Sequence, residues 1–265
     1  MPYLAWANFG GVSSTGTLLL CGAALLAGTF DAIVGGGGLI QLPAMLAVLP
    51  GTGVVYSLAT SKFVGTVGAT ASAIAYSRKA PMDWGTIARM SSAGLPAAMA
   101  GAACSSALPG RLLNVVVLVA LVLAVGYTVG KPDLGMAEQP RTAAGGRPGV
   151  AVIGGAVIGF WDGLGAPGTG SFLVFVLTGL AGYSFLSASA IAKVVNVATS
   201  TGALIFFIPA GKVLWGLGIV MAASNIIGGV IGTAFAVRGG TTFIRRVFLG
   251  VAVTLILSVT VKLFG

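Results

Sequence analysis

The sequence contains no histidine, and only five of its 265 residues are acidic. Without histidine, the chain cannot use imidazole acid–base catalysis or bind a metal through histidine. Its two cysteines, Cys21 and Cys104, lie in separate apolar segments and form no CxxC pattern, so no disulfide framework is expected. No serine or cysteine has an evident base partner in the sequence. We therefore expect neither a cofactor nor an enzymatic activity.

Charged residues are also scarce, at 7% of the chain against about 25% in an ordinary soluble domain. Hydrophobic residues make up 57% of the chain and 43 residues are glycine, a composition that suits helices packed closely in lipid. The formal charge is +9, but most basic residues lie between long apolar segments, which indicates membrane topology rather than nucleic-acid binding. No basic segment precedes the first apolar stretch, so a cleaved signal peptide is not expected. We predict a multi-pass protein surrounded by the lipid bilayer, with no nucleic-acid partner.

The apolar segments predict an all-α polytopic membrane protein. A spanning helix needs about 20 residues, and most segments reach that length. Two shorter segments each follow a glycine-rich break, at 35–38 and 166–170, and the one polar linker is 131–148. The predicted segments are 17–34, 39–50, 54–76, 84–108, 111–130, 149–165, 171–180, 185–209, 215–237 and 241–264.

The two halves of the chain are similar when positions 131 residues apart are compared. Asp31 then corresponds to Asp162, and Lys62 corresponds to Lys193, with no net gap between these pairs. We therefore predict two tandem repeats, 17–130 and 149–264, joined by the linker 131–148. Each repeat has a glycine-broken or re-entrant first helix followed by three spanning helices. Helical repeats of this size are typical of secondary transporters.

The short segment after each break decides whether the repeats are parallel or inverted. If it returns to the side it entered from, each repeat crosses the membrane an odd number of times and the two copies are inverted. In that arrangement all the loop bases except Arg111, Lys212 and Lys262 share one side. Eight continuous spans would separate the bases less sharply. We favour inverted repeats, with both termini outside the cytoplasm.

The two aspartates and two lysines at matched positions lie inside apolar segments. A charge at bilayer depth costs about 2.5–3.5 kcal/mol or more on insertion scales, so these four residues must face one another or a polar cavity. One interpretation is that they form two pairs that only neutralise each other. The other is that Lys62 and Lys193 attract an anion while Asp31 and Asp162 bind protons or orient the lysines.

The glycine-rich breaks supply a second feature of such a site. A helix that restarts after a break directs free N–H groups and its positive dipole end into the membrane interior, where they can bind an anion. Glycines elsewhere, such as Gly28 and Gly101, are interpreted as close helix crossings. The predicted substrate-binding residues are Lys62, Lys193, Asn196, Thr60, Ser61, Gly36, Gly37, Gly38, Gln41, Gly168, Thr169, Gly170 and Ser171, with Asp31 and Asp162 in proton coupling or charge pairing.

Several of these stretches resemble one known family. The residues that carry the resemblance are AGTFDAIVGGGGLIQLP at 27–43, ATSK at 59–62, GFWDG at 159–163, PGTGSF at 167–172 and AKVVN at 192–196. They resemble the sulfite exporter TauE/SafE family, also called the toluene sulfonate uptake permease family, and its YfcA-like branch. The chain departs from that branch at Trp161, where tyrosine is usual, at Ala166, and at Ser61, where asparagine is common. The resemblance implies a bacterial inner-membrane carrier for small sulfur-containing or organic anions such as sulfite or sulfonates.

The leading hypothesis is a secondary transporter of a small anion with its site at the midplane between the repeats. Two lysines and two ionised aspartates carry no net charge, whereas protonation of one aspartate leaves +1, so proton coupling is part of this hypothesis. A passive anion channel and a non-transporting membrane scaffold are the alternatives. The partners considered are a small anionic substrate, the lipid bilayer and a second copy of the chain in a homodimer.

Overall fold

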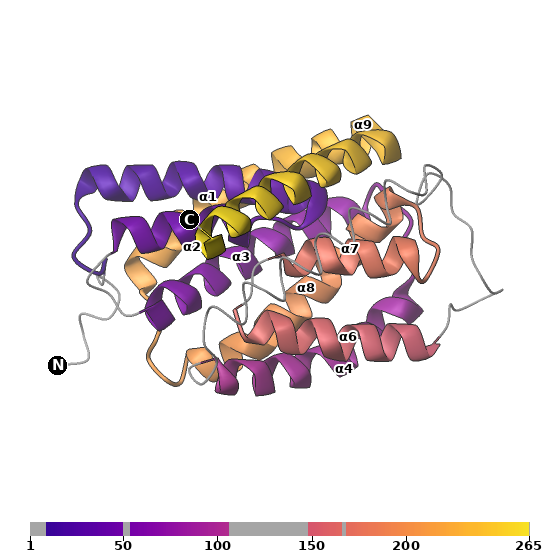
Figure 1. The fold of residues 1–265 in the computed structure, drawn as a ribbon, viewed down its shortest axis with the longest axis horizontal. Helices are drawn as coiled ribbons and strands as arrows, with labels where there is room; N and C mark the ends of the chain where they lie inside the picture. The colour runs from indigo at the N-terminus through magenta and orange to yellow at the C-terminus, as the bar shows by residue number, and fades with distance from the viewer. Residues whose placement is uncertain (1–8, 50–53, 106–147, 166–167, 265) are drawn as a thin grey trace.

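A computed structural model describes residues 9–49, 54–105, 148–165 and 168–264, and within them the chain is helical with no strand. The helices lie along one common direction in an elongated bundle (Figure 1). The predicted segment 111–130 and most of the linker 131–148 lie outside the described residues. The helices are α1 (Ser14–Val34), α2 (Gly38–Val48), α3 (Val54–Ser77), α4 (Trp84–Cys104), α6 (Pro148–Gly163), α7 (Thr169–Gly179), α8 (Phe185–Phe207) and α9 (Trp215–Phe264).

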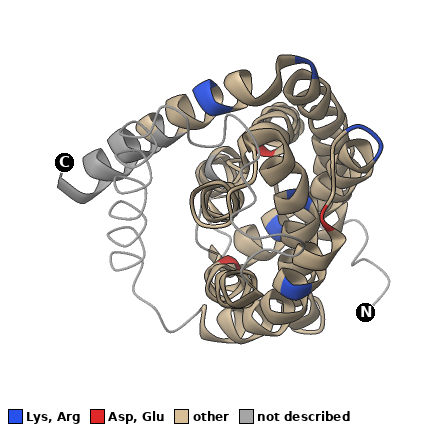
Figure 2. Cartoon of the chain, turned by 90° about the vertical axis from the view of Figure 1, so that its right-hand side faces the viewer, with Lys and Arg blue, Asp and Glu red and all other residues tan. Residues whose placement is uncertain are grey.

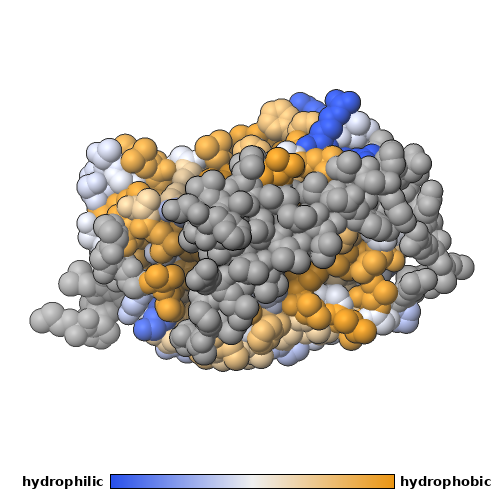
Figure 3. Space-filling model, viewed as in Figure 1, coloured by the Kyte–Doolittle hydropathy of each residue, from blue (hydrophilic) through white to orange (hydrophobic). Residues whose placement is uncertain are grey.

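The outer surface of the bundle is apolar. Within the described residues, three helical stretches are long and apolar enough to cross a membrane: Ser14–Val34, Phe185–Phe207 and Trp215–Val251. Large apolar side chains such as Leu18 and Ile153 are exposed, and orange apolar residues predominate where the surface in Figure 3 is coloured. Viewed along the bundle, charged segments lie inside the ring of helices as well as at its periphery (Figure 2). An apolar exterior around a polar interior is the arrangement expected in lipid.

The two glycine-rich breaks form the tips of two hairpins. α1 ends at Val34, its C-cap Gly35 adopts a left-handed conformation with φ 79°, and α2 begins at Gly38. Gly168, with φ 86°, caps the start of α7, while Ala166 and Pro167 lie outside the described residues. In Figure 1 the α1–α2 hairpin lies toward the left end of the bundle and the α6–α7 hairpin extends from the right. A Cβ atom on Gly35 would clash with the backbone of Gly170, so the two tips touch.

The helices of the two halves cross at glycines. A Cβ atom on Gly28 would clash with the carbonyl oxygen of Asn225, and one on Gly159 would clash with that of Gly94. Gly101 approaches the carbonyl oxygen of Phe160 in the same way. The interpretation of Gly28 and Gly101 as close helix crossings is therefore confirmed.

The last helical element contains a break at one residue. Gly240 has φ 63° and ψ −165°, a conformation that is essentially restricted to glycine, and α9 changes direction there (Figure 1). The predicted segments 215–237 and 241–264 therefore correspond to the two arms of α9. The predicted gap of three residues, 238–240, is reduced to one non-helical residue, Gly240, which supplies the whole turn.

Candidate functional site

The four intramembrane charges form two ion pairs, and each pair joins the two halves of the chain. Lys62 Nζ lies 2.5 Å from Asp162 Oδ1, and Lys193 Nζ lies 2.7 Å from Asp31 Oδ2. Adding 131 to Lys62 and subtracting 131 from Asp162 converts the first pair into the second. Lys193 and Asp162 are almost fully buried, while the side chains of Lys62 and Asp31 are 13% and 17% exposed.

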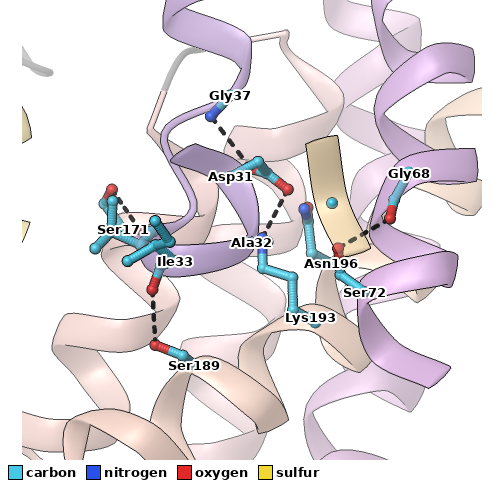
Figure 4. A network of polar contacts seen from close by, with 12 residues as sticks. Asp31, Ala32, Ile33, Gly37, Gly68, Ser72, Ser171, Ser189, Lys193 and Asn196 are labelled. Atoms are coloured by element: carbon cyan, nitrogen blue, oxygen red, sulfur yellow. Dashed lines mark hydrogen bonds and ion pairs between the residues drawn. The ribbon is translucent and has the colours of Figure 1, made fainter. Parts of the chain in front are cut away.

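Each carboxylate also accepts a second hydrogen bond, and the two second donors differ. The backbone N–H of Gly37 donates to Asp31 Oδ1 at 3.2 Å, so Asp31 connects the first glycine break to α8 (Figure 4). The hydroxyl of Ser200 donates to Asp162 Oδ2 at 3.0 Å. Both carboxylates therefore have a cation on one oxygen and a neutral donor on the other. This is the pattern expected for charges removed from water.

A polar cavity of about 80 Å³ lies where the two breaks meet. A single water needs roughly 10–15 Å³ on this measure, so the cavity has room for several waters or one small oxyanion. The first residues of α2 and α7 line it, which places two positive helix ends beside the same space. The predicted site residues that line it are Asp31, Asp162, Lys62, Ser61, Gln41, Asn196, Gly37, Gly38, Gly168, Thr169 and Gly170.

Three cavity residues carry hydrogen-bond donors that are not used within the described structure. Lys62 Nζ makes one hydrogen bond, to Asp162, and has two further hydrogens. Ser61 Oγ accepts from Gln41, and its own hydroxyl hydrogen has no acceptor among the described residues. Asn196 Oδ1 lies 3.4 Å from Ser200 Oγ, whose single hydrogen points mainly to the nearer Asp162 Oδ2, and the Asn196 amide nitrogen has no acceptor in the same part of the chain. All three residues therefore have free hydrogen-bond donors beside the cavity.

Asn225 of α9 also lines the cavity, and the sequence analysis did not predict it. Its side-chain nitrogen donates to the carbonyl oxygen of Ala24 at 2.9 Å and to Gln41 Oε1 at 3.1 Å. Gln41 Nε2 in turn donates to Ser61 O and Ser61 Oγ, each at 3.1 Å. An isolated amide in an otherwise apolar segment was the available signal, because such residues in membrane helices usually have a partner.

Four predicted substrate-binding residues do not line the cavity. Lys193 is fully buried behind Asp31, its ion-pair partner. Thr60 Oγ1 accepts a hydrogen bond from the backbone N–H of Leu214 at 2.9 Å, which ties α3 to the start of α9. Ser171 Oγ donates to the carbonyl oxygen of Val34 at 2.9 Å (Figure 4), and Gly36 is buried in the break. Among the described contacts Lys193, Thr60 and Ser171 hold the two halves together, and none of the four residues lines the cavity.

Comparison with known proteins identifies relatives along nearly the whole chain. A family model described as "Sulfite exporter TauE/SafE" matches residues 20–259. The "Probable membrane transporter protein ORF9" of a Sinorhizobium species is 32% identical over 236 residues, which cover 88% of each chain. The "Probable membrane transporter protein YfcA" of Escherichia coli K12 is 31% identical over 223 residues, covering 84% of this chain and 81% of the relative. No solved structure matches the chain.

Proposed function

Because the chain belongs to the sulfite exporter TauE/SafE family, a family with curated relatives named as probable membrane transporters, we propose that it transports a small anion through the cavity between its two glycine breaks. The protein is a multi-pass membrane transporter of the bacterial inner membrane. We further propose its substrate class, its coupling to protons and the inverted topology of its repeats.

The unused donors of Ser61, Lys62 and Asn196 carry the proposal of an anion. An anion offers only acceptors, and hydrogen bonds in which one partner is charged are roughly twice as strong as neutral ones. The two helix N-termini add positive partial charge at the same place. A cation would instead need carboxylate oxygens, and both aspartates already have their oxygens engaged.

The size of the cavity favours a small substrate. About 80 Å³ suits an inorganic oxyanion or an acid with a short organic chain. The family description names sulfite, which has this size and charge. We therefore propose sulfite and short sulfonates or related organic anions as the substrate class.

Charge balance supports proton coupling. The cavity region holds two lysines and two aspartates, and when all four are ionised their sum is zero. Protonation of one aspartate leaves +1, which an anion can neutralise on its way across the bilayer. Asp31 is the better candidate, because its side chain is 17% exposed while that of Asp162 is 2% exposed.

The exchanged contacts support inverted repeats. The Lys62–Asp162 and Lys193–Asp31 pairs are interconverted by the 131-residue offset, as are the crossings at Gly28 and Gly159. The α1–α2 and α6–α7 hairpins lie toward opposite ends of the bundle in Figure 1, as inverted copies require. A C-terminal reporter that is active only in the cytoplasm should remain inactive. An active reporter would contradict this topology.

A binding screen tests the proposed function directly. The purified protein is heated with sulfite, thiosulfate, sulfoacetate, taurine or acetate, and a bound anion raises the melting temperature by mass action. We expect at least one anion to do so, and Lys62→Ala to abolish the shift. Lys212→Ala is the matched control, because Lys212 lies over the Tyr56 ring outside the cavity. No shift with any anion, or an equal shift in Lys62→Ala, would contradict the proposal.

A further inference from the structure

We propose that Asn225, acting through Gln41, fixes the Ser61 hydroxyl as a hydrogen-bond donor for the transported anion. Asn225 and Gln41 are then positioning residues, and Ser61 contacts the substrate. The inference rests on the proposed function, since it assigns a role within the same cavity. Its consequence is that the site distinguishes the two ends of its substrate.

The orientation of the Gln41 amide follows from Asn225. Both hydrogens of the Asn225 amide are used, one by the carbonyl oxygen of Ala24 and one by Gln41 Oε1. Gln41 cannot reverse its amide, because the reversed group would place its nitrogen against the Asn225 nitrogen, and both are donors. Gln41 Nε2 must therefore face Ser61. Gln41 and Asn225 are both buried, at 2% and 3% exposure, so these bonds lie away from bulk solvent.

The Gln41 amide in turn determines what Ser61 can do. Hydroxyls on helices commonly donate to the carbonyl one turn earlier, as Thr66 does to the carbonyl oxygen of Lys62 at 2.7 Å. Ser61 makes no such bond among the described residues. Its Oγ instead accepts from Gln41 Nε2, which leaves the hydroxyl hydrogen for the cavity that Ser61 lines, next to Lys62.

This relay exists on only one side of the cavity. The positions 131 residues from Gln41 and Ser61 are Phe172 and Ala192, and the position 131 residues before Asn225 is Gly94. None of these side chains can hydrogen-bond. An anion therefore meets a hydroxyl donor held by this relay beside α3, whereas the free donor on the opposite side, the Asn196 amide, has no such relay behind it. A substrate with one oxyanion end should bind with that end against Ser61 and Lys62.

Space for Asn225 depends on a glycine. A Cβ atom on Gly68 of α3 would clash with Asn225 Oδ1, so Gly68→Ala displaces the Asn225 side chain without removing any polar group. Gly68→Ala is therefore a second way to disturb the relay. Gln41→Met is a third, because methionine keeps a similar volume and removes all three hydrogen bonds of the Gln41 amide.

A double-mutant cycle on anion binding tests the relay. The dissociation constants of sulfite, sulfoacetate and acetate are measured by calorimetry for the wild type, Ser61→Ala, Asn225→Ala and the double variant. Loss of a hydrogen bond to a charged group corresponds to a roughly 10- to 100-fold weaker dissociation constant in Ser61→Ala. Asn225→Ala should weaken binding severalfold. The double variant should bind no more weakly than Ser61→Ala, because Asn225 acts through the hydroxyl that is already missing.

Controls separate positioning from a general structural role. Thr70→Val removes a hydroxyl that donates within α3, to the carbonyl oxygen of Thr66, and should leave binding unchanged. Ser61→Thr keeps the hydroxyl and should recover binding relative to Ser61→Ala. If Asn225→Ala does not fold, Gln41→Met and Gly68→Ala enter the cycle in its place.

The outcomes distinguish this inference from the proposed function. Additive effects in the cycle, or wild-type affinity in Ser61→Ala while Lys62→Ala abolishes binding, would overturn the relay and leave the anion site intact. Failure of the wild type to bind any of the three anions would overturn the proposed function and the relay with it.

Discussion

Lys193 Nζ lies 2.7 Å from Asp31 Oδ2, and these two residues come from opposite halves of the chain. Lys193 is fully buried, and its hydrogen-bond partner is a carboxylate that lines the cavity. The pair therefore links the stability of the helix bundle to the charge of the site. Removal of either partner should therefore change both the stability of the helix bundle and the charge of the site.

Replacement of Lys193 alone should destabilise the protein strongly. Lys193→Met leaves Asp31 without its cation in a largely buried position, and breaking buried pairs typically costs about 3–5 kcal/mol. The double variant Asp31→Asn/Lys193→Met removes both charges and should recover most of the loss. Thermal unfolding in detergent measures both effects. A double variant less stable than Lys193→Met would contradict this account of the pair.

Asp31 should also control the response of transport to pH. Asp31→Asn resembles the protonated carboxyl at all pH values, so anion flux into proteoliposomes should no longer respond to an imposed pH gradient. The wild-type flux should respond severalfold. Asp83→Asn, which alters an aspartate outside the cavity, is the matched control and should keep the response. A gradient response that persists in Asp31→Asn would exclude Asp31 as the coupling residue.

Asp83 makes a separate, pH-dependent contribution to stability. It caps α4 by accepting from the backbone N–H of Thr86 at 3.0 Å, and it accepts from the Tyr183 hydroxyl in the other half at 2.5 Å. Burial acts to raise the pKa of Asp83, but the hydrogen bonds from Tyr183 and Thr86 outweigh it and hold the pKa below its ordinary value. Because the pKa of Asp83 is lowered in the folded state, its ionised carboxylate stabilises the fold at pH values above the unfolded-state pKa of about 3.9. This stabilisation is lost as the pH falls through the lowered folded-state pKa.

The comparison of wild type with Asp83→Asn isolates this charge. Asparagine still caps a helix, so the variant keeps the cap and loses the ionised acceptor. The wild type should melt higher at neutral pH, and the difference should shrink as the pH falls below about 4. Melting curves across this range provide the measurement. A difference that grows on acidification would have the wrong sign.

The contact between the hairpin tips should tolerate no side chain at Gly35. Gly35→Ala combines a left-handed backbone, which costs about 1–2 kcal/mol for an alanine, with a clash against the Gly170 backbone. A large drop in melting temperature is expected. Gly22→Ala on the same helix is the control, since its Cβ meets nothing and the substitution should raise stability by roughly 0.5–1 kcal/mol. Equal effects of the two substitutions would show that the tips do not touch.

The positions of the helices and breaks were predictable because local rules determine them. Four consecutive glycines cannot continue a helix without cost, and α1 ends at Val34 and α2 begins at Gly38, so the break lies where it was predicted. The matched aspartates and lysines were also predictable as buried charges. Their partners were not, because depth in the membrane does not determine which lysine faces which aspartate. A pair within one repeat would have satisfied the same argument as the observed pairs across the two halves.

The finer composition of the site was less accessible from sequence. Thr60 and Ser171 have the residue types of substrate ligands, but their hydroxyls are used by the backbone of the opposite half. Asn225 was missed because the 131-residue comparison aligns it with Gly94, so the repeat gave no signal there. Only the packing of α9 against α1 and α3 brings its amide to Gln41.

Uptake of sulfite into proteoliposomes most directly tests the claim that this cavity carries a small anion. The account predicts uptake that saturates with external sulfite, accelerates when unlabelled sulfite is trapped inside, and falls to background in Lys62→Ala while Lys212→Ala retains it. Saturation and exchange of this kind indicate a carrier, whereas a channel would show neither. Lys62→Ala vesicles that take up sulfite as fast as the wild type would contradict the account.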